Sequence, residues 1–323
     1  MKTVKRVIAL EECFWTPELK AAYDPKLVAQ RDQVSHGLLS DVGPERIARM
    51  DAAGIDLQVL SLVSPGPQCF DAPTGIRLAK NANDWLGGIV QKYPTRFAGF
   101  AALPTQDPQV AADELERTVK DLGFKGALIN GQTKGRYLDD KDFWVIFERA
   151  EALDVPIYIH PAELPPPIMD TYFKGPAAAL AGAGWGWAID TGTHLLRIIS
   201  SGAFDAFPNL KIVIGHMGEL IPFHMKRIQR GFTMAAKMGG GPPLKKTFSE
   251  YMRDNVYITT SGVFEHASLL CSVSALGIDN ILFSVDDPFA DNMEAMAFLN
   301  NAPLSLTDKE KLAHGNAEKL LKL

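Results

Sequence analysis

Short apolar runs recur along the chain and alternate with segments in which apolar residues repeat every three to four positions. The runs are rich in Val, Ile and Leu, which favours β-strands. The segments between them carry Asp, Gly or Pro at their ends, where helix caps belong. We therefore predict strands at 7–10, 57–62, 97–103, 126–130, 156–160, 211–216, 256–261 and 280–286, and helices that include 43–54, 107–123 and 139–154.

This order of elements is typical of an α/β protein with a (β/α)₈ barrel of the TIM type. We expect one barrel domain over residues 1–323. A doubly wound open sheet is the alternative, but no GxGxxG or GxxxxGK[ST] turn follows a predicted strand. Longer connections at 12–42 and 161–190 predict loop insertions over the C-terminal face, and the Gly-Pro run at 239–243 predicts another irregular connection.

Composition limits the partners of this barrel. The net charge is −5, so no basic surface for nucleic acid or anionic membranes is expected. No apolar run is long enough to span a membrane, and charge returns too early in MKTVKRVIALEE for a signal peptide. Cys13, Cys69 and Cys271 are scattered without a CxxC pair, a pattern typical of reduced thiols. We therefore expect a cytoplasmic protein.

Three predicted strands end in a side chain that could bind a cation. Glu11 follows the first strand, His160 ends the fifth and Asp286 ends the eighth. Since the C-terminal ends of barrel strands form the floor of the active site, these side chains would meet there. Such a mixed N/O set suits zinc, manganese or a similar divalent ion. Taken singly, each has an ordinary alternative: a salt-bridge glutamate, a hydrogen-bonded structural histidine and a helix N-cap.

A second group follows the predicted sixth strand, in the segment IVIGHMGEL. Glu219 lies three residues beyond His216, close enough to orient the imidazole through a carboxylate–histidine hydrogen bond. The pair could instead simply begin the helix GELIPFHMKRIQ. Arg227 lies on that predicted helix eight residues after Glu219 and can share its face, and a surface arginine is the alternative.

Several motifs together carry a resemblance to a known group of enzymes. The chain resembles the metal-dependent, non-oxidative hydroxybenzoate decarboxylases of the amidohydrolase superfamily, in the branch of aminocarboxymuconate semialdehyde decarboxylase. Members of this group decarboxylate γ-resorcylate, 2,3-dihydroxybenzoate, salicylate or 5-carboxyvanillate. The resemblance runs from about residue 7 to the closing NAEKLLKL and is carried by ALEE, FAALPTQDP, LGFKGALIN, DVPIYIHP, GAFDAFPNLKIVIGHMGE, ITTSG and ILFSVDDPF.

The resemblance implies cofactors, partners and residue roles. It implies one divalent ion, Zn²⁺ or Mn²⁺ with Mg²⁺ as a further choice, no organic cofactor, a small aromatic carboxylic acid as substrate, and a homodimer or homotetramer. Carried over position by position, it assigns Glu11, His160 and Asp286 as metal ligands, Asp286, His216 and Glu219 as catalytic residues, and Arg227, Asn130 and Trp185 as substrate contacts.

Two positions depart from the pattern of the group. Cys13 stands where many relatives have a histidine ligand; it could ligate zinc as a thiolate or fill space, and we favour space-filling because Glu11, His160 and Asp286 suffice. Asp287 stands where several relatives have tryptophan or serine, and it could alter the rim of the pocket or face solvent.

The activity that the resemblance implies is that of a carbon–carbon lyase. A hydroxybenzoate would be reversibly decarboxylated to a phenol and CO₂, with Asp286 protonating the ring and His216 and Glu219 assisting. The alternative on the same barrel is metal-dependent hydrolysis of a lactone or cyclic amide, with Asp286 as the base. A barrel that has lost activity and only binds a partner is a further alternative.

Overall fold

All the strands predicted from the apolar runs are present. The computed structural model describes residues 4–323. The run predicted as one strand at 97–103 is divided at Phe100. The strands are β1 (Ile8–Phe14), β2 (Leu57–Leu62), β3 (Phe97–Gly99), β4 (Ala101–Ala102), β5 (Ala127–Asn130), β6 (Ile157–His160), β7 (Ile212–Ile214), β8 (Val256–Thr259) and β9 (Ile281–Leu282).

Neighbouring strands pair in parallel and in chain order, as a (β/α)₈ barrel requires. β1–β2–β3 form one sheet and β4 to β9 form the other. The amide of Phe100, between β3 and β4, donates to the carbonyl of Leu60 at 2.9 Å. On the other side, the amide of Leu10 in β1 donates to the carbonyl of Phe283 at 3.3 Å, and Leu10 also forms a parallel bridge with Ser284. The predicted fold class is confirmed.

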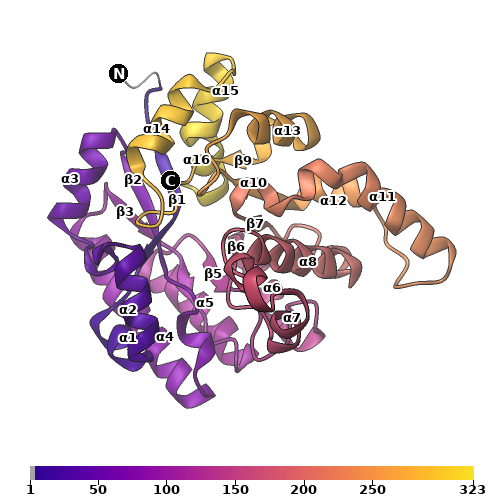
Figure 1. Cartoon of the computed structure of the whole chain (residues 1–323), viewed down its shortest axis with the longest axis horizontal. Coiled ribbons are helices and arrows are strands. Elements are labelled where there is room, and N and C mark those ends of the chain that lie inside the picture. The colour runs from indigo at the N-terminus through magenta and orange to yellow at the C-terminus, as the bar shows by residue number, and fades with distance from the viewer. Residues whose placement is uncertain (1–3) are drawn as a thin grey trace.

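Helices connect successive strands and surround the barrel (Figure 1). The predicted helices at 43–54 and 107–123 correspond to α3 and α5, and the one at 139–154 contains α6. The helices are α1 (Pro17–Ala22), α2 (Pro25–Val34), α3 (Pro44–Ala53), α4 (Ala72–Lys92), α5 (Pro108–Leu122), α6 (Trp144–Leu153), α7 (Pro166–Tyr172), α8 (Gly186–Ser200), α9 (Ala203–Ala206), α10 (His216–Glu219), α11 (Ile221–Lys237), α12 (Phe248–Asn255), α13 (His266–Leu276), α14 (Asn292–Asn301), α15 (Leu306–Glu310) and α16 (Asn316–Leu321).

The ends of α5 illustrate how local sequence sets these helices. The side chain of Asp107 accepts the Val110 amide at 3.2 Å and so caps the N-terminus. Gly123 closes the C-terminus with a φ of 71°, a conformation that glycine adopts without a steric penalty. Ala111 and Leu115, one turn apart, are fully buried in the core.

The interior of the barrel forms an apolar core of its own. Tyr158 of β6 is fully buried there, next to the ring of Phe100. Ala317 and Leu321 belong to the same cluster, so α16 covers one end of the barrel. The strand residues in this cluster include Ile8, Leu10, Leu57, Val59, Ala98, Leu128, Val213 and Leu282.

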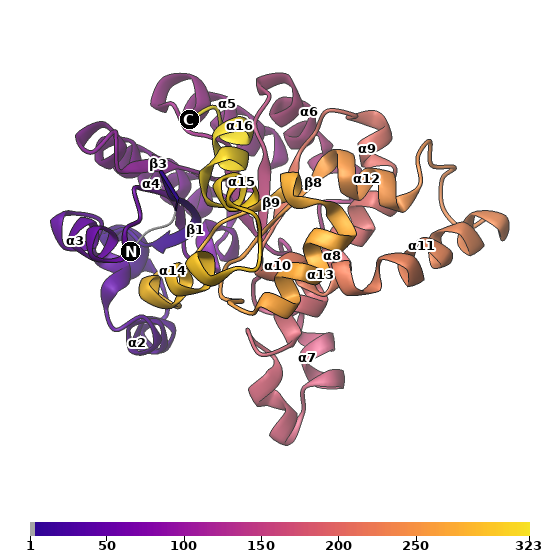
Figure 2. The ribbon, with the colours of Figure 1, turned by 90° about the horizontal axis from the view of Figure 1, so that it is seen from above.

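The connections predicted as loop insertions contain helices. Residues 12–42 include α1 and α2, and residues 161–190 include α7 and the start of α8. Figure 2 shows that α7 projects from the body of the barrel and that α11 extends away from it in another direction. The irregular connection at 239–243 lies in the loop between α11 and α12.

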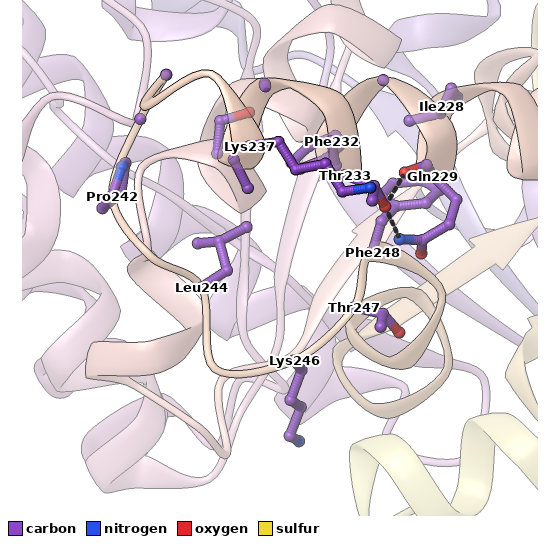
Figure 3. A pocket seen from close by; sticks show the side chains of 16 residues that line it. Ile228, Gln229, Phe232, Thr233, Lys237, Pro242, Leu244, Lys246, Thr247 and Phe248 are labelled. Atoms are coloured by element: carbon purple, nitrogen blue, oxygen red, sulfur yellow. Dashed lines mark hydrogen bonds between the residues drawn. The ribbon is translucent and has the colours of Figure 1, made fainter.

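That loop bounds a cavity of about 750 Å³ against α11 and the start of α12 (Figure 3). Its lining is largely apolar and includes Ile228, Phe232, Leu244 and Phe248. In the part of the chain that the structure describes, no Asp, Glu, His or Cys side chain lines this cavity. The candidate chemistry therefore lies elsewhere.

Two further predictions concern the whole chain. Within residues 4–323, no helix combines the length and apolar character that crossing a membrane requires. The cysteines are free thiols, with Cys13 buried and Cys69 exposed, as their scattered spacing predicts.

Candidate active site

Glu11 is fully buried in β1, and a β-bulge directs its side chain. The register of β1 against β2 shifts at this point, and Glu11 adopts a φ of 67°. Hydroxyl groups hold one carboxylate oxygen: Oε2 accepts from Ser261 at 2.6 Å, from Thr259 at 3.4 Å and from the hydroxyl of Tyr158. The other oxygen, Oε1, is buried and accepts no hydrogen bond.

Two imidazole rings point at this free oxygen. Nε2 of His160, at the end of β6, lies 3.3 Å from Glu11 Oε1, and Nε2 of His216, at the start of α10, lies 3.4 Å from it. The Nδ1 atoms have other partners, the carbonyl of Pro161 for His160 and Oε1 of Glu219 for His216, each at 2.7 Å. These partners favour a proton on Nδ1, which leaves the Nε2 lone pair available to a ligand.

Asp286 completes the group from the segment after β9. One ligand atom each of Glu11, His216 and Asp286 lies within 4.8 Å of the other two. The Oδ1 atom of Asp286 is buried without a hydrogen-bond partner. His160 lies next to this group through its contact with Glu11. Side chains from four separate parts of the chain thus converge at one end of the barrel.

The arrangement fits a divalent cation. Burying polar atoms without partners is costly, and here two carboxylate oxygens, Glu11 Oε1 and Asp286 Oδ1, lack hydrogen bonds. The Nε2 atoms of His160 and His216 face one of these oxygens at distances close to contact. A cation between these atoms would satisfy all of them, and the mixture of imidazole and carboxylate suits zinc or manganese.

The protein groups by themselves give this site a defined charge pattern. Burial raises the pKa of Glu11, but positive His216 and hydrogen bonds hold it at about 2. Burial is also the main cause that raises the pKa of Asp286 well above its usual range, and the charge of Glu11 adds to it. Burial lowers the pKa of His216, but Glu219 and Glu11 outweigh this effect and raise it to about 10. The pKa values of these two neighbouring carboxyl groups are therefore shifted in opposite directions, down for Glu11 and up for Asp286.

A cavity of about 740 Å³ opens beside these groups, large enough for a small aromatic molecule. His216, Glu219 and Asp286 line it on the polar side. Trp185, predicted as a substrate contact, lies in the lining and is 47% exposed. The remaining wall is mostly apolar and includes Trp187, Leu220, Pro222, Phe223, Val263, Ala267 and Phe289.

Arg31 is a candidate that sequence reasoning missed. Its guanidinium lies 5.7 Å from the ring of Trp187 and 5.9 Å from that of Phe289, and both rings line the cavity. Its side chain is 11% exposed, its Nε atom is buried without a partner, and it pairs with Glu163 at 3.2 Å. The charge of Arg31 lowers the pKa of Asp286, against the larger effect of burial. Arg31 comes from α2, whose sequence gives no signal of this placement.

Two predicted substrate contacts lie outside this cavity. Asn130 is buried at the end of β5, where its backbone amide donates to Gln68 Oε1 at 2.7 Å. Arg227 is exposed and lines a separate open groove between α8 and α11. The expectation that it shares a helix face with Glu219 is wrong, because Leu220 adopts a φ of 66° and separates α10 from α11. Leu220 itself gives no signal of this break, although Gly218 lies in the same left-handed run and Pro222 follows in the first turn of α11.

Cys13 and Asp287, the two residues that depart from the pattern of the decarboxylases, are both buried. Cys13 is 2% exposed, and burial is the main cause that raises the pKa of its thiol well above the usual range, so the neutral thiol is favoured. Asp287 neither faces solvent nor lines this cavity. Its Oδ2 atom accepts from Arg46 Nε at 3.0 Å and Nη2 at 2.5 Å, and both residues are buried.

Comparison with known proteins places this geometry in a family. A model of the amidohydrolase family matches residues 31–323. The chain belongs to the amidohydrolase family. It is 40% identical over 324 residues to a γ-resorcylate decarboxylase of Polaromonas sp., an alignment that covers 98% of each chain.

Solved structures of amidohydrolase relatives match the same fold. One is 5-carboxyvanillate decarboxylase from Sphingomonas paucimobilis, with a TM-score of 0.93, 40% identity and coverage of 98% of this chain and 99% of that one. Another is a dihydroxybenzoic acid decarboxylase from Polaromonas sp. with bound manganese and the inhibitor 2-nitroresorcinol. It has a TM-score of 0.90, 39% identity and coverage of 99% and 98%. These relatives are carboxy-lyases, and the second carries the kind of ion that the present site fits.

Proposed function

We propose that this amidohydrolase-family protein is a metal-dependent, non-oxidative decarboxylase of a hydroxybenzoate, which releases a phenol and CO₂. One observation carries the proposal: Asp286, whose Oδ1 atom is buried without a hydrogen bond, lies both within the cation-binding group and in the lining of an aromatic-walled cavity. The decarboxylases among the relatives favour this activity over hydrolysis of a lactone or cyclic amide.

The chemistry explains why an acid should stand at that place. An aryl carboxylate loses CO₂ slowly because the electron pair of the breaking bond lies in the ring plane. Transfer of a proton from Asp286 to the carbon that bears the carboxylate removes this obstacle. The bond to the carboxylate carbon then breaks, its electron pair restores the aromatic ring, and CO₂ leaves. Burial is the main cause that raises the pKa of Asp286, and this direction favours the protonated acid that the step requires.

The surrounding residues take supporting roles in this proposal. Glu11, His160 and Asp286 would hold the ion, with His216 Nε2 also within reach of it. When bound, the divalent ion would orient the substrate and stabilise negative charge on its oxygens. His216, hydrogen-bonded to Glu219 at 2.7 Å, would return a proton to Asp286 after each turnover.

The cavity suggests how the ring would be held. Trp185, Trp187 and Phe289 supply apolar walls, and the guanidinium of Arg31 lies 5.7 Å and 5.9 Å from the last two rings. A guanidinium in this setting is suited to an anionic group on the substrate. We therefore assign to Arg31 the contact with an anionic group that the resemblance gave to Arg227, since Arg227 lies outside this cavity within one chain.

A homodimer or homotetramer is part of the same proposal. The exposed apolar side chains Phe223 and Met234 on α11 and Met238 just after it support it, because such residues are common at subunit contacts. Light scattering of the purified protein measures the assembly directly.

Product analysis tests the activity. The metal-loaded protein is incubated with salicylate, 2,3- and 2,6-dihydroxybenzoate, orsellinate and 5-carboxyvanillate, and the matching phenols are separated by chromatography. We expect a phenol from at least one acid, its loss after chelation and its return with Mn²⁺. Metal-loaded protein that yields no phenol from any of them would contradict the proposal.

A further inference from the structure

Glu12, next to the candidate metal ligand Glu11, has a separate function in the structure. Both carboxylates are fully buried although they are consecutive in β1. Glu11 leaves one oxygen without a hydrogen bond, toward the candidate metal site. Glu12 uses both of its oxygens, and its partners all lie in the segment after β9 that carries Asp286.

Glu12 binds the backbone amides of the two residues that flank Asp286 in the sequence. Its Oε1 atom accepts the amide of Val285 at 3.0 Å, and its Oε2 atom accepts the amide of Asp287 at 3.0 Å. The residue between these amides, Asp286, adopts a φ of 78°, which a residue with a side chain rarely takes. A single carboxylate thus binds the main chain on both sides of a left-handed residue, which holds that conformation in place.

A buried ion pair fixes the next residue. Asp287 Oδ2 accepts two hydrogen bonds from Arg46 of α3, and Asp287 Oδ1 accepts one from Asn292 at 3.0 Å. Arg46 Nη2 also donates to the carbonyl of Cys13 at 2.8 Å, and the amide of Cys13 donates to the carbonyl of Asp287 at 2.7 Å. Residues 12–13, which follow Glu11, are therefore joined to residues 285 and 287, which flank Asp286.

We propose that Glu12 is a positioning residue, which sets the direction of the Asp286 carboxyl toward the ion and the substrate by binding the amides of Val285 and Asp287. The inference rests on the proposed function for its effect on catalysis, but its effect on metal binding stands independently. Residues that orient metal ligands in this way typically change metal affinity or activity about 10- to 100-fold when they are replaced.

Glu12→Gln tests this role with little change in size. The glutamine oxygen can still accept one of the two amides, but its NH₂ group would face the other amide as a second donor. We expect the Kd for Mn²⁺, measured by titration calorimetry, to rise about 10- to 100-fold, and kcat at saturating Mn²⁺ to fall about as much. Glu12→Asp keeps a carboxyl group on a side chain that is one methylene shorter, and it should behave in the same way.

Glu114→Gln is the matched control. Glu114 is a buried carboxylate on α5, hydrogen-bonded by Asn83 at 2.7 Å and Arg117 at 2.8 Å, with no contact to the candidate site. Its Mn²⁺ affinity and kcat should stay within about threefold of the wild type, even where its melting temperature falls.

The outcomes separate the two proposals. A wild-type protein that binds Mn²⁺ but makes no phenol contradicts the decarboxylase function and leaves the Mn²⁺ test of Glu12 in force. A folded Glu12→Gln protein with Mn²⁺ affinity within about threefold of the wild type overturns the positioning role. If neither Glu12 variant folds, Glu12 has a structural role only, and the inference is likewise overturned.

Discussion

Replacing Asp286 with asparagine separates proton transfer from folding and from the shape of the site. Asparagine keeps the size of the side chain and one carbonyl oxygen, but it has no proton to give to a ring carbon. A positioned general acid contributes about 10²- to 10⁴-fold to a rate. That range corresponds to roughly 3–5 kcal/mol of transition-state stabilisation. We therefore expect kcat of the metal-loaded Asp286→Asn protein to fall by about 10²-fold or more.

The same substitution should not lower the stability of the metal-free protein. Burial raises the pKa of Asp286, so ionising this group costs free energy in the folded state. The cost grows as the pH rises from the ordinary aspartate value toward the raised one, and asparagine removes it. At pH 7 the chelated variant should therefore melt at or above the temperature of the chelated wild type, measured by calorimetry.

Initial rates of phenol formation, with Mn²⁺ content determined on the same samples, measure the catalytic effect. Glu114→Gln serves as the comparison, because Glu114 is a buried carboxylate whose hydrogen-bond partners, Asn83 and Arg117, lie outside the lining of the cavity. Near-normal turnover by a metal-loaded, folded Asp286→Asn protein would refute the reasoning, since another group would then supply the proton.

Three further substitutions test single contacts of the site. Burial lowers the pKa of His216, and the charge of Glu219 does most to raise it to about 10. Glu219→Gln removes that charge, so NMR titration of the metal-free protein should show a lower His216 pKa. The kcat of this variant should fall about 10-fold or more. Arg31→Met should raise KM about 10- to 100-fold with kcat little changed, and an unaltered KM would show that Arg31 does not meet the substrate. Cys13→Ala should retain one Mn²⁺ per chain and most of the activity, and loss of the ion would identify Cys13 as a ligand.

The sequence was sufficient for the barrel because its signal is local. Each strand is a short run of apolar residues that must be buried on both faces, so the eight runs stand out from the amphipathic segments between them. Polar residues near the ends of these runs are equally visible in the sequence, because they contrast with the apolar residues before them. Glu11, His160 and Asp286 were selected because they interrupt buried runs, and the structure brings all three to the same end of the barrel.

Contacts between residues far apart in sequence could not be predicted. Arg31, in an insertion, lies beside the rings of Trp187 and Phe289, and Arg46 meets Asp287 across 241 positions. The break before α11 was also not predicted. Its left-handed run includes Gly218 but continues through Glu219 and Leu220, whose side chains give no such signal. This break is why Arg227 does not share a helix face with Glu219, so the error over that shared face has a conformational origin.

Isotope tracing in D₂O tests the central claim most directly. Carboxyl-¹³C-labelled 2,6-dihydroxybenzoate and 5-carboxyvanillate are incubated separately with Mn²⁺-loaded protein and followed by NMR. The account predicts that the label from at least one of them appears as CO₂ and bicarbonate, and that the phenol carries one deuterium at the carbon that held the carboxylate. Labelled carboxylate that stays on both rings, in protein shown to hold its ion, would contradict the account.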